Sequence, residues 1–220
     1  MKNKPNPSTF SDLGAAESEA LARITTLKSF ATGEVVFLEG EPCRGLYIVQ
    51  EGWLKAVKTS LSGREQVIRF LGPGEECNEV GAFTDEANQA TLIALEPSQI
   101  RIVQRAALLR LVDEHPDLAR VIIQSMAKRI MHLMGLIEDL SLRTVVARLA
   151  RMFLDHSDGD ILNRRRWSTQ TEMAARLGTV PDVLNRALRS LADENLIEIE
   201  RYQVRILDRA GLETKAAGDQ

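Results

Sequence analysis

The 220-residue sequence predicts an α+β protein with an N-terminal β-barrel, one long helix and a C-terminal winged helix-turn-helix. Three observations predict this architecture. Eight of the 14 glycines fall within 33–81, between short β-rich runs. Apolar residues then repeat with heptad spacing over 119–140, and two short helices joined by a glycine turn precede alternating strands. The expected boundaries are 1–115 for the barrel domain, 116–141 for the long helix and 142–220 for the last domain.

The composition is that of a globular protein with an ordinary core, since 44% of residues are hydrophobic and 27% are charged. No run approaches the ~18 apolar residues of a membrane span, and the polar N-terminus lacks the apolar stretch of a signal peptide. We therefore expect a cytoplasmic protein with no membrane partner. Two cysteines are too few for a disulfide framework, a four-cysteine metal site or an iron–sulfur cluster.

The N-terminal region contains short apolar runs separated by turns, which is typical of a meander or barrel. We expect strands at 35–38, 46–49, 53–57, 67–71, 91–94 and 100–103. Ser62-Gly63 predicts a hairpin turn, because glycine accepts a positive φ. Flanking helices are expected at 13–26 and 106–114, and Pro116 ends the second of them.

From Asp117 onward the apolar residues adopt helical spacing. Ile at heptad position a with Leu at d favours a parallel two-stranded coiled coil, so the seam predicts a homodimer. The alternative is that the same stripe packs against the barrel of its own chain. The expected dimerisation residues are Ile123, Met126, Ile130, Leu133, Ile137 and Leu140, separated by three, four, three, four and three residues.

The C-terminal region predicts a helix-turn-helix. Ser168 and Thr169 offer a capped start to a helix over 171–177, because a hydroxyl accepts from the free N–H groups of the first turn. Gly178 suits a left-handed C-cap, and Pro181 is acceptable in the first turn of the next helix. The two helices share an apolar side formed by Met173, Leu177, Leu184, Ala187, Leu188 and Leu191.

The exposed side of the second helix carries the side chains that can read DNA. Arg bonds guanine bidentately, Asn suits adenine, and a carboxylate accepts from cytosine. Apolar and polar residues alternate over 198–206, which indicates two short strands that form a wing. The alternative, an ordinary helical hairpin with a solvated basic face, does not explain these strands. From residue 141 onward the chain has 13 basic and 12 acidic residues, so local arginines supply the electrostatic footprint. The expected DNA contacts are Thr169, Thr179, Pro181, Asp182, Asn185, Arg186, Arg189, Arg201 and Arg205.

This order of barrel, long helix and winged helix-turn-helix resembles the cyclic-AMP receptor/fumarate–nitrate regulator (CRP/FNR) family. The motifs that carry the resemblance are Gly33-Glu34 through Glu39-Gly40-Glu41, Leu46-Tyr47-Ile48-Val49 with Gly52, 70–75, 79–83 and 172–186. The resemblance implies a double-stranded β-helix, a cyclic-nucleotide-binding-like barrel that binds an effector. It also implies a homodimer that binds double-stranded palindromic promoter DNA and has RNA polymerase as a partner.

The sequence departs from the cyclic-AMP-binding branch at the phosphate. The Arg-Ser step of that branch is matched by Gln89 and Ala90, so the phosphate loses its charge partner, although Glu79 matches the glutamate that contacts ribose. Leu133 and Met134 stand where polar residues contact adenine, which disfavours cyclic AMP because a buried amino group would lack a partner. The effector-site residues implied by the resemblance are Glu79, Val80, Gly81, Ala82, Gln89, Ala90, Thr91, Leu133, Met134 and Leu136.

The iron–sulfur branch is also disfavoured, because no cysteine precedes Cys43. The recognition-helix pattern of that branch is nevertheless similar to Asp182, Asn185 and Arg186. Some relatives without a cluster bind haem, for which His132 or Cys77 are the candidate axial ligands, and the alternative is that His132 is an ordinary structural histidine. Cys43 and Cys77 as redox sensors is a further alternative to buried, inert thiols.

The sequence therefore predicts a homodimeric, sequence-specific transcription regulator controlled by an effector, redox or gas signal in the barrel. The alternatives within this class are a haem-dependent sensor of nitric oxide or carbon monoxide and a constitutive regulator with an empty barrel. A cupin-like metal enzyme is the remote alternative, but the histidines lie outside the expected strands. A pure scaffold protein is disfavoured by the arginines of the second helix. No catalytic residues and no metal site are expected, and the cofactor is unknown.

Overall fold

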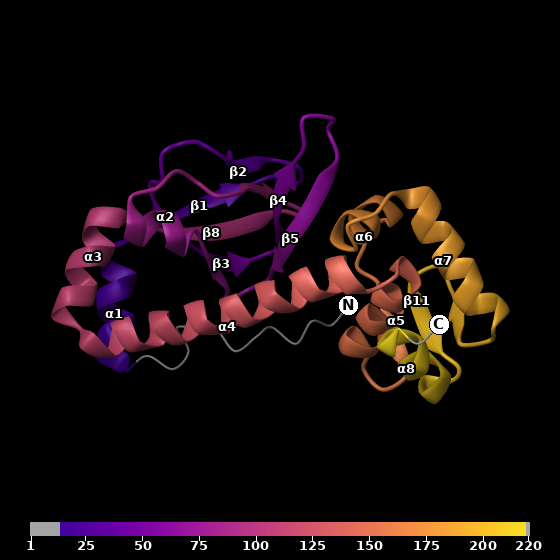
Figure 1. Cartoon of the computed structure of the whole chain (residues 1–220). Helices are drawn as coiled ribbons and strands as arrows, with labels where there is room; N and C mark the ends of the chain where they lie inside the picture. Colours follow the sequence, from indigo (N-terminus) through magenta and orange to yellow (C-terminus); the bar gives the residue numbers. More distant parts are fainter. Residues whose placement is uncertain (1–13, 219–220) are drawn as a thin grey trace. The chain divides into compact units, whose positions relative to one another are not determined.

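The computed structural model describes residues 14–218, which divide into two compact units. One unit comprises 14–58 and 68–132, and the other comprises 59–67 and 133–218. The predicted α+β class, with barrel, long helix and helix-turn-helix in that order, is confirmed (Figure 1). No helix within 14–218 combines the length and apolar character needed to span a bilayer.

The barrel region begins with a helix and continues as short strands. Its elements are α1 (Ala15–Arg23), β1 (Thr25–Phe30), β2 (Val35–Phe37), β3 (Gly45–Glu51), β4 (Leu54–Thr59), β5 (Glu65–Leu71), β6 (Glu76–Cys77), α2 (Glu79–Thr84), β7 (Thr91–Ala94), β8 (Ser98–Gln104), α3 (Arg105–Glu114) and α4 (Pro116–Leu142). The predicted turn at Ser62-Gly63 separates β4 from β5, and Gly63 has a φ of +78°.

The strands form two sheets that share one core. Among the described strands, one sheet has the order β1-β8-β3-β6 and the other has the order β2-β7-β4-β5. Side chains from both sheets meet in one buried cluster, so the core lies between them. This cluster contains Phe37, Tyr47, Val49, Leu54, Leu71, Cys77, Leu92, Ala94 and Ile100.

A second cluster covers the other side of the β3–β8 pair. Leu46 and Ile48 of β3 and Val103 of β8 contribute to it from the sheet. The helices contribute Leu21 (α1), Ala82 (α2), Leu108 and Leu111 (α3), and Leu118 and Ile122 (α4). The first turns of α4 are therefore fixed to the barrel by burial of apolar side chains.

The C-terminal unit is a helical domain with a small sheet. Its elements after α4 are α5 (Val145–His156), β9 (Ile161–Asn163), α6 (Gln170–Arg176), α7 (Pro181–Asp193), β10 (Ile197–Ile199), β11 (Gln203–Ile206) and α8 (Arg209–Ala217). The sheet has the order β10-β11-β9. One core holds the unit together, with Phe153, Leu184, Leu191, Val204 and Leu212 from five different elements.

The structure corrects the expected helix over 13–26, of which residue 13 lies outside the described residues. The helix ends at Arg23, and Thr25–Phe30 is instead strand β1, which pairs antiparallel with β8. Ile24-Thr25-Thr26 are β-branched residues, whose restricted side chains favour a strand. Helix α8 is a further element that was not predicted; its N-cap is Asp208, whose side chain accepts from the Gly211 N–H.

Candidate functional site

The helix-turn-helix is built from local signals that the structure bears out. The Thr169 hydroxyl accepts from the Glu172 N–H at 3.2 Å and so caps α6. Gly178 has a φ of +66°, and the Thr179 N–H donates to the Ala174 carbonyl at 2.9 Å. These are the features of a Schellman motif, which satisfies the last carbonyls of α6 and reverses the chain. Pro181 then occupies the first turn of α7.

Helix α7 has one buried and one exposed side. Leu184, Ala187, Leu188 and Leu191 are buried in the core of the unit. Asp182, Arg186 and Arg189 are exposed on the other side, Pro181 is exposed at the start, and Asn185 is half-buried. Within residues 14–218, the side chains of Asp182, Arg186 and Arg189 make no hydrogen bond or ion pair. These polar groups are therefore available to an external partner.

The two predicted wing arginines differ in their surroundings. Arg205 faces Glu198 across the β10–β11 pair, and its guanidinium lies 3.9 Å from Glu198 and 3.4 Å from Glu200. Arg201 is exposed at the turn of the wing, with its guanidinium carbon 5.1 Å from the centre of the Tyr202 ring. Glu198 and Glu200 would therefore compete with DNA phosphate for the Arg205 guanidinium. The Arg201 guanidinium is instead stacked on an aromatic ring.

In the barrel, the residues of the expected effector site lie mainly on α2 and β7. Glu79, Gly81 and Ala82 are buried, whereas Val80 is 46% exposed. Gln89 is exposed, and its amide donates to the Ala87 carbonyl at 2.9 Å. The Thr91 hydroxyl accepts from the Glu39 N–H, and Ala90 is half-buried. The position of Gln89 and Ala90 thus carries no positive charge for a phosphate.

A network of charged groups that the sequence analysis missed surrounds Glu79. Arg129 of α4 pairs with Glu79 at 2.6 Å and also donates to the Glu76 carbonyl at 3.1 Å. Arg69 of β5 donates to the same carbonyl at 3.1 Å and pairs with Glu75 at 2.8 Å. The Ser125 hydroxyl donates to the Glu76 carboxylate. Burial raises the pKa of Glu79, and the neighbouring Arg129 charge opposes that rise.

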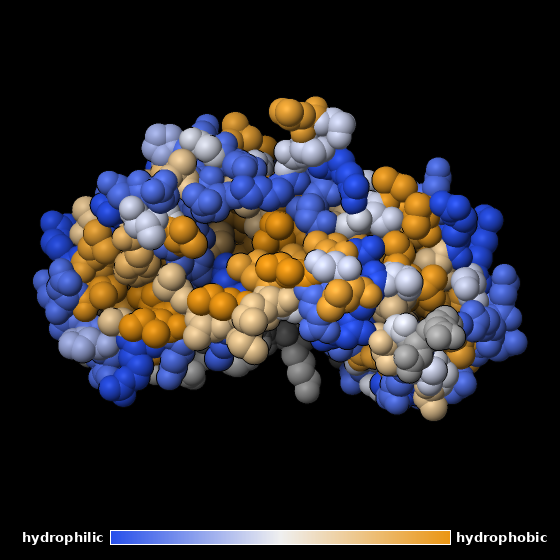
Figure 2. Space-filling view, viewed as in Figure 1, coloured by the Kyte–Doolittle hydropathy of each residue, from blue (hydrophilic) through white to orange (hydrophobic). Residues whose placement is uncertain are grey.

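The exposed side of α4 carries an apolar stripe, which is visible as orange side chains along this helix in Figure 2. Ile123, Ile130 and Ile137 are 65%, 58% and 64% exposed. These are the a positions of the predicted seam. Met134 is 59% exposed and adds to this surface. Within residues 14–218, no side chain covers this row of isoleucines.

The d positions of the seam are different from the a positions. Met126 packs against the cluster on β3 and β8, and Leu133 is half-buried, while Leu140 is 38% exposed. Met126 therefore packs against its own barrel, as the alternative interpretation of the stripe expects. The reason is that α4 must bury one side against its own barrel, and the heptad pattern does not separate that side from a partner-facing side. The isoleucines at the a positions are exposed, and their role in a dimer stays a prediction.

Two family models match the chain. The cyclic nucleotide-binding domain matches residues 27–115, and the Crp-like helix-turn-helix domain matches residues 147–215. The chain belongs to the CRP/FNR family. It is accordingly a DNA-binding transcription regulator of the CRP/FNR type.

Relatives of the chain span almost its whole length. The CRP-like cAMP-activated global transcriptional regulator of Mycobacterium tuberculosis is 26% identical over 209 residues, which cover 91% of this chain and 93% of the relative. The cyclic AMP receptor protein of Thermus thermophilus is 25% identical over 221 residues, covering 99% of both chains. The solved structure of FixK2 from Bradyrhizobium japonicum has the same fold, with a TM-score of 0.76 and 20% identity, covering 90% of this chain and 100% of that one.

The surroundings of the two cysteines and of His132 bear on the haem and redox alternatives. Cys77 is buried in the core between the two sheets, and burial raises the pKa of its thiol. His132 is exposed on α4. Burial likewise raises the pKa of the Cys43 thiol, which keeps it protonated and disfavours reactivity.

The enzyme alternative rested on metal ligands carried by barrel strands. His115 caps the end of α3, His132 lies on α4 and His156 lies on α5, so each is outside a strand, as the sequence predicted. In the described part of the chain, no group of three His, Cys, Asp or Glu side chains is arranged to hold a metal ion. The relatives are transcription regulators rather than enzymes.

Proposed function

We propose that this CRP/FNR protein is a homodimer that binds palindromic promoter DNA and responds to a signal other than cyclic AMP. The observation that carries the proposal is that the chain has two exposed surfaces of different kinds. One is the isoleucine row of α4, and the other is the unpaired polar side of α7 with Asp182, Arg186 and Arg189. A dimer built on the first surface presents the second surface twice.

The a-position isoleucines support dimerisation through burial. Transfer of apolar surface out of water contributes roughly 25 cal/mol per Å², and a fully buried Ile about 1.5–3 kcal/mol. Ile123, Ile130 and Ile137 repeat every seven residues, so they meet the same residues of a parallel second copy. Two recognition helices about 34 Å apart then fit successive major grooves, which is why a palindromic site is expected.

The lack of a positive charge at Gln89 and Ala90 supports a signal other than cyclic AMP. Gln89 is neutral and bonded to its own loop, and Glu79 is engaged by Arg129. An effector that binds in the barrel would shift α4 between two arrangements and thereby set the spacing of the recognition helices. RNA polymerase is the partner proposed for the regulator once it is bound to promoter DNA.

The competing candidate is cyclic AMP itself, because two relatives are named for it. Calorimetric titration of the full chain with cyclic AMP tests this directly, and the proposal predicts no binding up to millimolar nucleotide. Cyclic AMP binding that tightens the DNA complex would contradict the proposal. A haem sensor would instead give a Soret band, shifted by carbon monoxide or nitric oxide, after reconstitution with haem. Unchanged DNA binding with every additive would favour a constitutive regulator.

A further inference from the structure

A histidine and an arginine join two helices inside the C-terminal unit. His156 is the last residue of α5, Arg176 is the last residue of α6, and both side chains are half-buried. The Nη2 nitrogen of the Arg176 guanidinium lies 2.5 Å from Nε2 of the imidazole. The other ring nitrogen, Nδ1, lies 2.9 Å from the Met152 carbonyl oxygen. Both nitrogens of the ring thus have a partner.

These two partners fix the protonation state of the ring. A guanidinium can only donate hydrogen bonds, and a carbonyl oxygen can only accept them. Nε2 of His156 therefore accepts from Arg176, and Nδ1 carries the proton that is donated to Met152. This is the neutral imidazole with its hydrogen on Nδ1. A second proton would have to sit on Nε2 and would point at the guanidinium, so protonation of His156 and its bond from Arg176 exclude each other.

The charges beside this contact disfavour a positive imidazole. Burial lowers the pKa of Arg176 to about 10, so the guanidinium keeps its charge at neutral pH. Asp155 is the acidic neighbour on α5, but its side chain is 57% exposed and its carboxylate lies 3.7 Å from the Arg151 guanidinium. An exposed carboxylate contributes little to the stability of a nearby cation. The bonded guanidinium therefore outweighs it.

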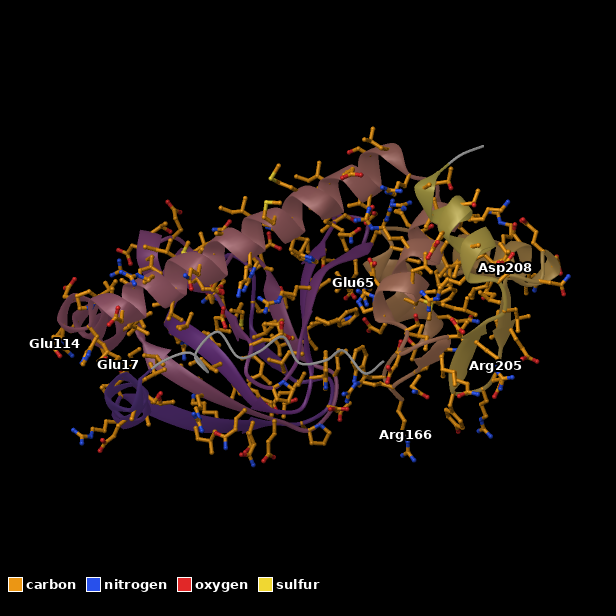
Figure 3. The ribbon with its side chains drawn as sticks, turned by 90° about the horizontal axis from the view of Figure 1, so that it is seen from below. Glu17, Glu65, Glu114, Arg166, Arg205 and Asp208 are labelled. Carbon is orange, nitrogen blue, oxygen red and sulfur yellow. The ribbon has the colours of Figure 1, made fainter. Side chains whose placement is uncertain are left out.

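Two further helices, α7 and α8, pack against α5. Arg209 follows Asp208, the N-cap of α8 that is labelled in Figure 3. It donates to the Ser157 hydroxyl at 3.3 Å and pairs with Asp160 at 3.1 Å. Helix α7 contributes apolar side chains such as Leu184 to the core that it shares with α5. A second proton on the ring would therefore face one guanidinium from α6 and have another nearby at the start of α8.

The position of Arg176 connects this contact to the recognition helix. Arg176 lies two residues before Gly178, whose positive φ reverses the chain, and five residues before Pro181, where α7 begins. A half-buried guanidinium that loses an acceptor pays a desolvation cost and has to move toward water. Such a movement would loosen the last turn of α6, which leads directly into α7.

We propose that His156 is a positioning residue whose neutral form holds Arg176 and the helix-turn-helix in place, so that acid weakens DNA binding. The effect on DNA rests on the proposed function, whereas the contact between the two side chains does not. The imidazole of the loosened form can take a second proton and that of the native contact cannot. Acid therefore favours the loosened form below the ordinary histidine pKa of about 6.5, and the effect is absent well above that pH.

The first measurements use the full chain without DNA. With 15N-labelled histidine, the ring nitrogens of His156 should show the Nδ1–H tautomer at about pH 7.5. The signals are assigned by their loss in His156→Gln. Hydrogen exchange of residues 170–180, corrected for the intrinsic rate at each pH, should accelerate on acidification to about pH 5.5 in the wild type and much less in His156→Gln. An Nε2–H tautomer, or equal acceleration in both proteins, would overturn the proposal.

The second measurement is fluorescence anisotropy with a duplex that the wild-type protein enriches from a random pool. Wild-type affinity should fall with acid by up to about tenfold per subunit for each pH unit below the histidine pKa, since one proton per subunit is involved. His156→Gln should lose much less affinity, because its amide oxygen can accept from Arg176 and takes up no proton in this range. Arg176→Met should behave likewise, because the ring then takes a second proton without meeting a guanidinium.

His115→Gln is the matched control, because it removes a histidine at the end of α3, outside the C-terminal unit, and its DNA binding should follow the wild-type pH profile. Thermal unfolding at neutral pH checks that each variant is folded. Equal acid dependence of DNA binding in the wild type and His156→Gln would overturn the proposal and leave the proposed function intact. If the wild type binds no duplex at any pH, the proposed function fails, and the tautomer and exchange measurements still decide the role of His156.

Discussion

At the residue scale, the proposed DNA-reading surface depends on side chains that have no partner within residues 14–218. Arg186 lies one turn after Asp182 on the exposed side of α7, and neither is paired within residues 14–218. A guanidinium that is free and fixed on a helix can bond guanine O6 and N7 together. These polar side chains of α7 can therefore bind DNA because no other group within residues 14–218 pairs with them.

Arg186→Ala is expected to weaken operator binding by about 1–3 kcal/mol per half-site and to flatten the preference at one base pair. Binding to the operator and to single-base variants measures both effects. Arg120→Ala, which removes an exposed arginine from α4, is the control for the loss of charge. Equal weakening on every sequence would show that Arg186 holds phosphate instead of reading a base.

The ion pair between half-buried Arg129 and buried Glu79 gives a pH-dependent prediction. Removing one partner of a buried ion pair costs about 3–5 kcal/mol, so Arg129→Met should strongly destabilise the barrel at neutral pH. Without Arg129, the already raised pKa of Glu79 rises further. When the pKa of a carboxyl is higher in the folded than in the unfolded state, the folded protein loses stability as the pH rises through the folded-state pKa.

The loss in Arg129→Met should therefore be largest at neutral pH and shrink as the pH falls toward the ordinary pKa of glutamate. Urea unfolding of the variant and the wild type between pH 4 and pH 8 measures this trend. Lys128→Met, at the exposed neighbouring position, is the control and should show no such trend. A pH-independent loss would mean that Arg129 acts through packing and not through its charge.

At the element scale, the long helix α4 has two apolar sides. Leu118, Ile122 and Met126 pack against the barrel, whereas Ile123, Ile130 and Ile137 are uncovered. An amphipathic helix with a second apolar stripe has to bury that stripe elsewhere or leave it in water. Burial against a second copy is the expected outcome.

Ile130→Lys should give a monomer in sedimentation experiments, because it places like charges opposite each other in a dry contact. Binding to a palindromic site should weaken in parallel. Met131→Lys is the matched control: the neighbouring residue is 68% exposed and lies off the isoleucine row, so the variant should stay dimeric. A dimeric Ile130→Lys protein with wild-type affinity would contradict the use of this row as an interface.

The elements that could be predicted from the sequence are those whose signals are local. The N-cap Thr169, the left-handed Gly178 and Pro181 lie within 13 residues of one another, and they specify the helix-turn-helix without help from the rest of the chain. The network around Glu79 could not be predicted in this way. Arg69, Glu76 and Arg129 come from β5, β6 and α4, and only closure of the barrel brings them together.

The strand Thr25–Phe30 and the Arg205–Glu198 ion pair also depend on pairing with distant segments, whereas helix α8 has a local signal. Thr25–Phe30 becomes a strand because β8 is available to pair with it, and no turn signal near residue 24 marks the change. Helix α8 had a usable signal, with Asp208 as N-cap and Leu212 and Ala216 spaced to share one face. The pairing of Arg205 with Glu198 depends on the β10–β11 register, which the alternating pattern alone does not fix.

At the scale of the whole molecule, the proposed function requires two copies of α7 that read one duplex together. Selection from a pool of random-sequence duplexes is the most direct measurement of this claim. We expect enrichment of an inverted repeat with half-site centres about 34 Å, or one helical turn, apart. Arg186→Ala should relax one symmetric pair of positions in that repeat. A pool that stays random, or a single half-site with no symmetric copy, would contradict DNA reading by a dimer.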